Sequence, residues 1–411
     1  MASTATTTFT NWAGNQRCHP ARRVSPGSEA KVLAAVRAAA VAHHGVRVVA
    51  TGHSFSPVHL TEGTLIDLDN LRGVVNVDGA SGRVTALPGT PVGDFGRPLW
   101  DAGLALANQG DIDTQGISGA IGTATHGSGI MLESISATLR RCRIVTASGD
   151  VVEIDPAQPE LLAAAQVSVG MLGVMTEVEL QAVPAHRLVE QIKHWSYDEA
   201  IGQFDERVAR HRHFSMFWCP TEHSAGLYGL EMDPSKPAAD ACYVKIYDEA
   251  PDDLPDSVTP GRRVDRSHRI YPQVFEPNFH ELEYFVRFDQ AKDAIGAMRE
   301  LMLANQPDAV FPLEIRTVAA DTAYLSPQYE TPTLVLSVSG QAGTEYWSYL
   351  RKVDALLGGD FGARVHWGKL HFLTAEQLHS RYPMAQAFID IRREFDPDGL
   401  FLNDHLRPLF A

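Results

Sequence analysis

Apolar positions near the start of the chain change from a helical spacing to a strand-like spacing. Residues 31–44 carry an apolar stripe at helical intervals, which Ser28 can cap and Gly45 can end. The run VRVVA at residues 46–50 follows directly and predicts a buried strand. A helix that leads straight into a buried strand indicates an α/β-like unit at the N-terminus.

Short elements continue from there to Pro184. The pattern predicts three strands, at residues 64–68, 74–78 and 83–87, and then a turn and a helix closed by Gly103 at 88–106. A hairpin follows at 137–155, and a helix, a bend and a strand at 161–185. Residues 147–150 form the turn of the hairpin. The pattern therefore predicts a first region built from short strands with few helices.

The composition changes after Pro184. Aromatic residues and histidines become denser, and strand-like segments alternate with helix-like ones. Residues 373–410 are predicted to be helical, with a turn at 396–399. We therefore expect an α+β protein with divisions at 1–183, 184–375 and 376–411.

Composition and charge exclude several classes of protein. The 411 residues are enough for two or three domains. A formal net charge of −15 opposes binding to nucleic acid or to an anionic membrane surface. No apolar run reaches the roughly 18 residues of a transmembrane helix, and the N-terminus lacks the pattern of a secretory signal. Four widely spaced cysteines favour neither a zinc site nor a disulfide scaffold, so we expect a cytoplasmic protein.

Two segments rich in small residues carry the candidate chemistry. His53 lies in TGHSFSP, directly after the predicted strand at 46–50, and GISGAIGTATHGSG occupies residues 116–129. Glycines at these intervals allow backbone N–H groups to approach a pyrophosphate. The spacing differs from the dinucleotide-binding GxGxxG pattern, and tight loop packing explains many such runs. A lone loop histidine can equally cap a turn or bind phosphate.

In combination, these motifs resemble the vanillyl-alcohol-oxidase-type (PCMH-type) flavoproteins. NWAGN at residues 11–15, EIRTVAAD at 314–321, HWGK at 366–369 and the terminal FDPDGLFLND extend the resemblance over nearly the whole chain. Within that family the sequence is similar to the alditol oxidase and aldonolactone oxidase branch, and to alditol oxidases most closely. The resemblance implies a two-subdomain FAD-binding domain, a substrate-binding cap with an antiparallel sheet flanked by helices, and a C-terminal segment that returns to the FAD domain.

The resemblance makes FAD the expected cofactor, bonded covalently from a ring nitrogen of His53 to the flavin 8α-methyl. A neutral imidazole is a competent nucleophile for such a bond. The glycine run contains no cysteine for a second flavin bond. The expected FAD contacts are His53 with Ala50, Thr51, Gly52, Ser54, Phe55, Gly110, Gly116, Gly119, Gly122, Thr123, His126, Gly127, Gly173, Val174 and Asn403.

Charged residues on two apolar segments indicate a polar pocket. Glu314 and Arg316 are two residues apart and share one face of a predicted strand. Lys369 shares a face with Val365 and His371 if residues 365–372 also form a strand. The charged residues of either segment could instead form a structural ion pair. Two apolar segments that both carry charges are better explained by one shared polar pocket than by two separate ion pairs.

The resemblance places Glu314, Arg316 and Lys369 around the substrate as catalytic residues. Hydride would pass from a carbinol carbon to flavin N5, with Arg316 and Lys369 stabilising the alkoxide or accepting its proton and Glu314 orienting hydroxyls. The expected substrate contacts are Asp111, Ser337, Ser339, Thr317 and His371.

The loop at Gly110 and Asp111 departs from the alditol oxidase pattern. Alditol oxidases carry a small hydroxyl residue where this chain has Asp111. The extra carboxylate resembles the lactone-oxidising relatives, and Gly110 leaves space that would favour oxygen access. His211 and His213 have no third ligand at clear spacing, so no metal is predicted.

The interpretation is an FAD-dependent oxidase of a polyol or related sugar that reduces O2 to hydrogen peroxide. The alternative is a gulono- or arabinono-1,4-lactone oxidase or dehydrogenase, using O2 or another acceptor. A flavin- or carbohydrate-binding protein without turnover is disfavoured by the charged set at residues 314, 316 and 369. A small carbohydrate and O2 are the expected partners, and a monomer or small oligomer the expected state.

Overall fold

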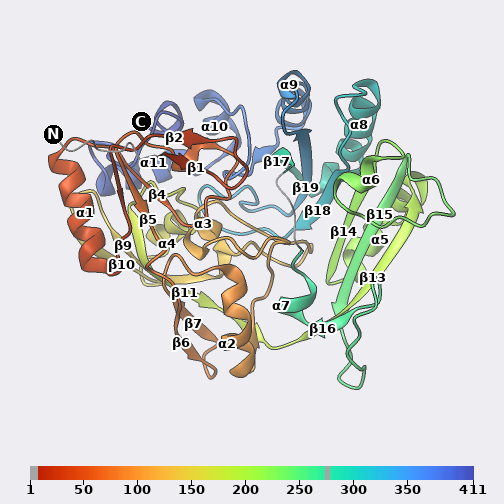
Figure 1. The fold of residues 1–411 in the computed structure, drawn as a ribbon, viewed down its shortest axis with the longest axis horizontal. Coiled ribbons are helices and arrows are strands. Elements are labelled where there is room, and N and C mark those ends of the chain that lie inside the picture. The colour runs from red at the N-terminus through yellow and green to blue at the C-terminus, as the bar shows by residue number, and fades with distance from the viewer. Residues whose placement is uncertain (1–7, 274–277) are drawn as a thin grey trace.

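The computed structural model describes residues 8–273 and 278–411. Strands from the first half of the chain gather on one side of the molecule, and a large antiparallel sheet occupies the other side (Figure 1). Residues 1–7, on which the expected lack of a secretory signal partly rests, lie outside the described residues. The fold is α+β, as expected from the sequence.

A small parallel sheet forms the N-terminal α/β unit. Its order is β3-β5-β4, and helix α1 provides the crossover that parallel strands require. Ser28 caps α1 by accepting a hydrogen bond from the Lys31 N–H, as predicted. The side chains of Val32 and Val36, on one face of α1, are fully buried. The bounds are β3 Arg22–Val24, α1 Glu29–Val41, β4 Val46–Val49 and β5 Thr64–Asp67.

A second sheet, of order β10-β9-β11-β7-β6, is antiparallel throughout. The predicted hairpin is confirmed as β9 and β10, and Gly103 ends its helix with φ +75°. The strands of this sheet are β6 Val74–Asp78, β7 Arg83–Ala86, β9 Leu139–Val145, β10 Val151–Ile154 and β11 Val174–Gln181. Two separate two-stranded sheets are formed by β1 Phe9–Thr10 and β2 Arg17–Cys18, and by β8 Leu104–Ala105 and β12 Val183–Pro184. The helices of this region are α2 Gly96–Asp101, α3 Ile117–Gly122 and α4 Pro159–Gln166.

The large sheet has eight antiparallel strands in the order β16-β13-β15-β14-β18-β19-β17-β20. The bounds are β13 Arg187–Ser196, β14 His213–Cys219, β15 Ala241–Glu249, β16 Val264–Arg266, β17 Phe279–Arg287, β18 Leu313–Val318, β19 Thr333–Gln341 and β20 Arg364–Val365. The prediction of a strand at residues 365–372 is wrong, because β20 ends at Val365 and the chain turns directly after it.

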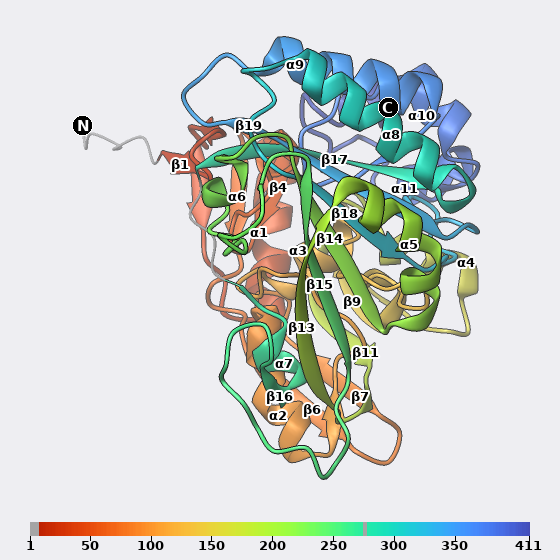
Figure 2. The same ribbon diagram turned by 90° about the vertical axis from the view of Figure 1, so that its right-hand side faces the viewer.

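Helices cover one face of the large sheet. Helices α5 and α8 lie in front of its strands in Figure 2, and Phe204 of α5 packs edge-on against Phe214 at 5.9 Å between ring centroids. The opposite face is therefore left for the first half of the chain. The helices here are α5 Tyr197–Arg210, α6 Ser224–Leu227, α7 Ser267–Ile270, α8 Ala291–Ala304 and α9 Trp347–Val353, continued by a π-helical segment Asp354–Asp360.

The C-terminal segment packs back on the parallel sheet. Val46 donates its N–H to the Leu400 carbonyl, and buried Arg47 donates to the Phe401 carbonyl. The Asn403 amide donates to the carbonyls of residues 57 and 60. The helices are α10 Ala375–Arg381, α11 Ala385–Phe395 and α12 Arg407–Phe410.

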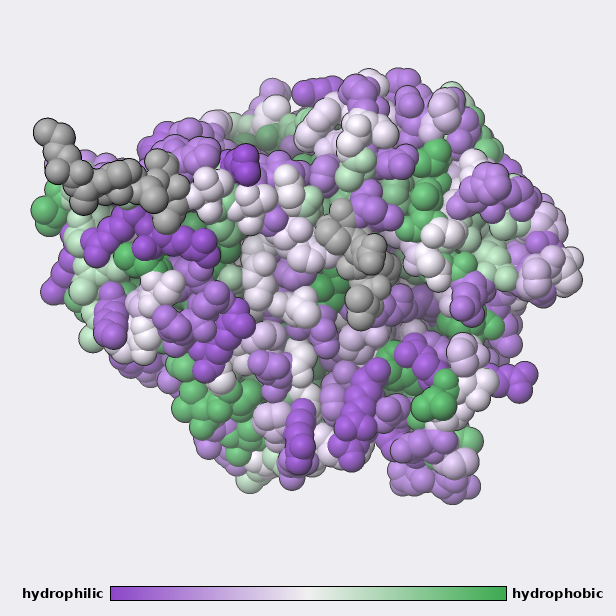
Figure 3. Space-filling view, viewed as in Figure 1, coloured by the Kyte–Doolittle hydropathy of each residue, from purple (hydrophilic) through white to green (hydrophobic). Residues whose placement is uncertain are grey.

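Hydrophilic side chains cover most of the face shown in Figure 3. Among residues 8–273 and 278–411, no helix has the length and apolar character needed to cross a bilayer. The divisions expected near residues 183 and 375 stay predictions.

Candidate active site

The loop after β4 presents His53 to a large cavity. Gly52 has φ +68°, a conformation that glycine adopts without strain, and its carbonyl accepts the Trp12 N–H. The Asn11 side chain donates to the Ser54 carbonyl, and the Trp12 ring lies 4.8 Å from the His53 ring. The NWAGN segment therefore holds this loop in place.

The His53 ring is suited to react as a neutral imidazole. Its Nε2 lies 3.0 Å from Thr114 Oγ1, whereas its Nδ1 is buried without a partner among the described residues. Burial, together with the charge of Lys369, lowers the pKa of His53 to about 4. At neutral pH the ring is therefore uncharged, and its Nδ1 is unbonded in a residue that lines the cavity.

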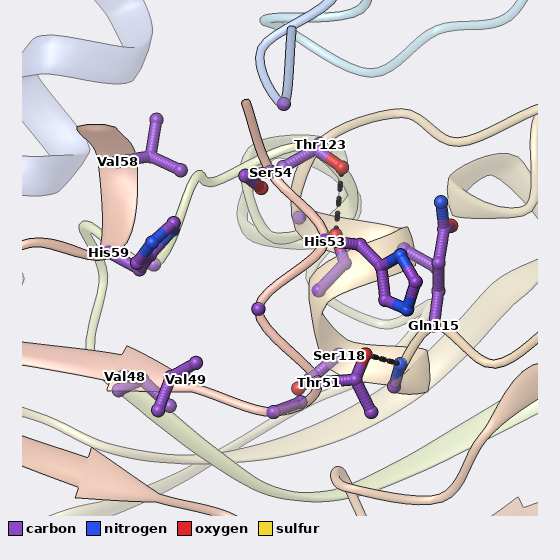
Figure 4. Close-up of a pocket in the computed structure, with 18 of the residues that line it drawn as sticks. Val48, Val49, Thr51, His53, Ser54, Val58, His59, Gln115, Ser118 and Thr123 are labelled. Atoms are coloured by element: carbon purple, nitrogen blue, oxygen red, sulfur yellow. Dashed lines mark hydrogen bonds between the residues drawn. The ribbon is translucent and has the colours of Figure 1, made fainter. Parts of the chain in front are cut away.

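That cavity has a volume of about 1110 Å³ and lies beside α3. Figure 4 shows the His53 ring beside Gln115, with Thr51 and Ser118 in the same pocket. A Cβ at Gly116 would come within 2.4 Å of the Ala50 Cβ, whereas a Cβ at Gly119 would meet no atom within 4 Å. The first glycine permits close backbone packing, and the second leaves open space for a ligand.

Most of the residues expected to contact FAD line this cavity. They are Ala50, Thr51, Gly52, His53, Ser54, Phe55, Gly116, Gly119, Gly122, Thr123 and Gly173. Lining residues that the sequence reasoning missed include Arg47, His59, Gln115, Ser118, Ser168, Val169 and Gly170. Ser118 lies within the glycine run at 116–129 and Gln115 directly precedes it, whereas Arg47 and His59 belong to no motif singled out above.

Five of the expected FAD contacts lie elsewhere. Gly110 and His126 line a second cavity. Gly127 lies against the Asn108 side chain, Val174 is buried in a hydrophobic cluster, and the Asn403 amide holds the turn after β4. A glycine run predicts backbone proximity but cannot tell which of its members face the ligand.

The second cavity, of about 590 Å³, lies over the inner face of the large sheet. Phe217, Glu314, Ser337 and Glu283 form one cross-strand row, because neighbours on β14, β18, β19 and β17 are paired in register. Glu281 pairs with Ser339 one step along the same strands. The antiparallel register therefore collects, on one face, polar side chains that lie between residues 281 and 339 of the chain.

Arg316 lies between two carboxylates of this cavity. Its Nε donates to Glu314 at 2.6 Å, and its Nη2 donates to Asp111 at 2.8 Å. Lys245, which is 2% exposed, also contacts Asp111, at 3.3 Å. Asp111, from the loop before α3, is thus paired with two cations of the sheet.

The two carboxylates around Arg316 have pKa values pushed in opposite directions. Burial opposes the charge of Asp111, but Lys245 and Arg316 outweigh it and lower the pKa of that carboxyl. Burial raises the pKa of Glu314 to about 7, against the opposing charge of Arg316. Glu314 is therefore the carboxyl of this pair that can exchange a proton near neutral pH.

Lys369 is held by a turn rather than by a strand. Its N–H donates to the His366 carbonyl at 3.0 Å, and its ammonium forms an ion pair with Glu281. Burial opposes its charge, but Glu281 and Glu283 outweigh this effect and raise the pKa of Lys369. The lysine stays protonated at neutral pH.

A buried histidine–carboxylate pair completes the wall. The His126 Nδ1 lies 2.8 Å from the Gly127 carbonyl, and its Nε2 lies 2.9 Å from Glu283, which also accepts from Ser337. A carbonyl cannot donate, so His126 Nδ1 donates to Gly127, while the charge and hydrogen bond of His126 outweigh burial and hold the pKa of Glu283 well below its usual range. His126, Glu283 and His366 are close enough to hold a metal ion, and in this structure His126 and Glu283 are hydrogen-bonded to each other.

Several expected substrate contacts are placed outside the cavity. Thr317 alternates with Arg316 on β18 and faces away, and His371 contacts His405 with 3.2 Å between their Nε2 atoms. Ser339 bonds to the Tyr228 hydroxyl, which itself lines the cavity. His211 and His213 share no site, since they bond to Asp248 and to the Ser128 carbonyl.

The sequence reasoning missed Glu281 and Glu283. They lie two residues apart in the apolar strand FHELEYFVR, which is the same signal that revealed Glu314 and Arg316. Lys245, a single cation in CYVKIYDE, offers a weaker signal of the same kind.

Comparison with known proteins identifies the family. The profile described as "FAD binding domain" matches residues 20–155, and that of "D-arabinono-1,4-lactone oxidase" matches 253–409. An L-gulono-1,4-lactone dehydrogenase of Mycobacterium tuberculosis is 33% identical over 97% of this chain and 98% of its own. The chain belongs to the vanillyl-alcohol-oxidase-type FAD flavoproteins, in their aldonolactone and alditol oxidase branch.

A second relative agrees with that assignment, and a solved structure shares the fold. An alditol oxidase of a Streptomyces species is 29% identical over 98% of this chain and 99% of its own. A solvent-stable cholesterol oxidase shares the fold, with a TM-score of 0.83 and 18% identity over 98% of this chain and 97% of that one. This flavoprotein is an FAD-dependent oxidoreductase.

The residues of the first cavity fit FAD. The unbonded Nδ1 of His53 and the open space at Gly119 are features that a bound ligand would satisfy and fill. The adjoining second cavity shares Ile112, Gln115, Thr125, His366 and Lys369 with the first, so a substrate there would lie next to the cofactor.

Proposed function

We propose that this flavoprotein oxidises a CH–OH carbon of a neutral aldonolactone. The observation that carries the proposal is the charge balance of the substrate cavity. Arg316 pairs with Glu314 and Asp111, Lys245 with Asp111, and Lys369 with Glu281, while Glu283 is hydrogen-bonded to His126. A site whose charges are already compensated favours an uncharged, hydroxyl-rich ligand over a sugar acid or a phosphate ester.

Aromatic side chains support a cyclic substrate. Phe217, Tyr228 and Phe279 line the same cavity as the charged residues. A lactone ring presents C–H faces to such rings and hydroxyls to the polar wall. Similarity to an L-gulono-1,4-lactone dehydrogenase over nearly the full chain supports the same substrate class.

The residues divide the chemistry between charge and proton transfer. FAD supplies the two-electron acceptor for the hydride of the carbinol carbon. Arg316 and Lys369, both held protonated, oppose the negative charge that develops on the substrate oxygen. Glu314, with its raised pKa, accepts the hydroxyl proton in its ionised form.

We also propose that His53 is bonded to the flavin 8α-methyl through its Nδ1. Support comes from the buried, unbonded Nδ1 and from the low pKa that keeps the ring neutral. The test is acid precipitation of the holoenzyme. Yellow colour should stay with the wild-type pellet and be absent from the His53→Ala pellet, whereas colour in the wild-type supernatant would contradict the covalent bond.

A polyol is the second candidate substrate, favoured by the alditol oxidase that aligns along the whole chain. The decisive experiment is anaerobic bleaching of the flavin with L-gulono-1,4-lactone, D-arabinono-1,4-lactone, xylitol and sorbitol in parallel. Faster reduction by either lactone supports the main proposal, and faster reduction by either polyol replaces it with the second. Bleaching by none would indicate a binding protein without turnover.

The electron acceptor and setting complete the proposal. Gly110 lines the substrate cavity, and we assign it to oxygen access, with hydrogen peroxide as the second product. Reoxidation by a dye but not by O2 would make the protein a dehydrogenase instead. Four free, buried cysteines fit a reducing cytoplasm, and we propose a monomer or small oligomer.

A further inference from the structure

A basic cleft of about 1000 Å³ lies beside β20, at the edge of the large sheet. It is framed by β20, the π-helical segment Asp354–Asp360 and helix α10. Arg287, Arg364 and Arg381 all line it. Three guanidinium groups around one cleft are notable in a chain whose net charge is −15.

Two of these arginines have no carboxylate within ion-pair distance in the described part of the chain. Arg364 donates to three backbone carbonyls, those of Arg381, Pro327 and Tyr329, and Arg381 donates to the carbonyl of Ala363. Burial lowers the pKa of Arg364, because its charge is poorly solvated. A partly buried guanidinium that is bonded to neutral groups gains from a bound anion.

Carboxylates around the cleft are already engaged. Asp321, whose charge acts on Arg364, accepts a hydrogen bond from the Ser326 hydroxyl. Asp289 pairs with Arg287 on the exposed rim, at 2.7 Å. Asp354 accepts a hydrogen bond from the Tyr284 hydroxyl. None of these three carboxylates forms an ion pair with Arg364 or Arg381, so the cleft keeps its positive character.

A buried hydroxyl independently indicates a missing ligand. Thr333, the first residue of β19, is 1% exposed, and its Oγ1 has no hydrogen-bond partner among the described residues. It lines the cleft together with Thr331, Gln377 and Ser380. An unpaired buried hydroxyl costs free energy, which an acceptor oxygen in the cleft would recover.

Glycines keep one wall of the cleft free of side chains. A Cβ at Gly358 would come within 2.9 Å of the Arg381 guanidinium, whereas Cβ atoms at Gly359 and Gly362 would meet nothing within 4 Å. Gly358 and Gly359 belong to the π-helical segment, and π-helical turns occur frequently at functional sites.

We propose that this cleft binds a small molecule through a phosphate group. Guanidinium forks match phosphate oxygens in pairs, and the Thr333 hydroxyl adds a neutral donor. The site is separate from the substrate cavity, with Phe285 between them. The Phe285 ring lines the cleft and lies 5.2 Å from the ring of His126, which lines the substrate cavity.

Isothermal titration of the holoenzyme with inorganic phosphate tests the proposal. Wild type should bind one phosphate per chain, with an affinity that falls as ionic strength rises. Ser380 is exposed, so Ser380→Glu adds a negative charge to the rim without disturbing the core, and Ser380→Gln is its neutral control. Binding should weaken at least tenfold in Ser380→Glu and persist in Ser380→Gln.

The Thr333→Val variant separates binding from folding. Valine keeps the shape of threonine and removes a hydroxyl that lacks a partner, so thermal stability without phosphate should hold or rise while phosphate affinity falls. No saturable heat with wild type, or equal affinity in Ser380→Glu and Ser380→Gln, would overturn the proposal. Binding of citrate but not of phosphate would also overturn it.

Discussion

The Asp111→Asn substitution tests whether the carboxylate holds the loop before α3 to the large sheet. Asn keeps the shape of Asp111 but removes the charge that pairs with Lys245 and Arg316. Arg316 retains Glu314, whereas Lys245, 2% exposed, keeps no carboxylate partner among the described residues. The main cost of the substitution is therefore an uncompensated buried ammonium.

Breaking a buried ion pair by removing one partner costs about 3–5 kcal/mol. Because about 1.4 kcal/mol corresponds to a factor of ten, Asp111→Asn should raise the unfolding equilibrium constant by roughly two to three and a half orders of magnitude. Lys245→Met removes the cation and leaves Asp111 paired with Arg316, so it should cost less, about 1–2 kcal/mol. The double variant should regain about 2–3 kcal/mol relative to the sum of the two single variants.

Urea unfolding of the holoenzyme, followed by tryptophan fluorescence, measures these differences. Asp113→Asn is the matched control, because Asp113 lies on the same loop and burial raises its pKa without a stabilising cation. The control should be nearly neutral or slightly stabilising. Costs below about 1 kcal/mol for Asp111→Asn, or strict additivity in the double variant, would refute the electrostatic role of Asp111.

Three other outcomes follow from the site. Glu314→Gln should lower kcat/KM about 10²–10⁴-fold. Wild-type activity should rise with pH through about 7, where Glu314 ionises, and this rise should be absent from the variant; a rise that persists would exclude Glu314 as the base. Lys369→Met should lower the rate constant of flavin reduction, measured by stopped flow, about 10²–10³-fold, and Lys369→Arg should lower it less. Equal losses in the two variants would argue against charge stabilisation. Gly110→Val should slow flavin reoxidation by O2 and spare anaerobic reduction; unchanged reoxidation would remove Gly110 from the oxygen path.

Local signals in the sequence were sufficient for most elements of the first region. The Ser28 cap, the hairpin turn at residues 147–150 and the helix end at Gly103 depend on neighbours only a few residues away. The expected strand at 365–372 failed for a complementary reason. Apolar residues alternate with polar ones there, but the chain turns at His366, and Lys369 bonds back to His366 and carries its ammonium to Glu281.

The sequence by itself determined the α+β class, the His53 loop, the glycine run and the Glu314–Arg316 pair, because each depends on local spacing. Only the tertiary structure decided which residues meet. Sheet register placed Glu283 beside Ser337, and the packing of the first region on the sheet brought Asp111 to Lys245 and Arg316. These contacts join residues more than 50 positions apart, and their electrostatic effects depend on burial, which no local pattern specifies.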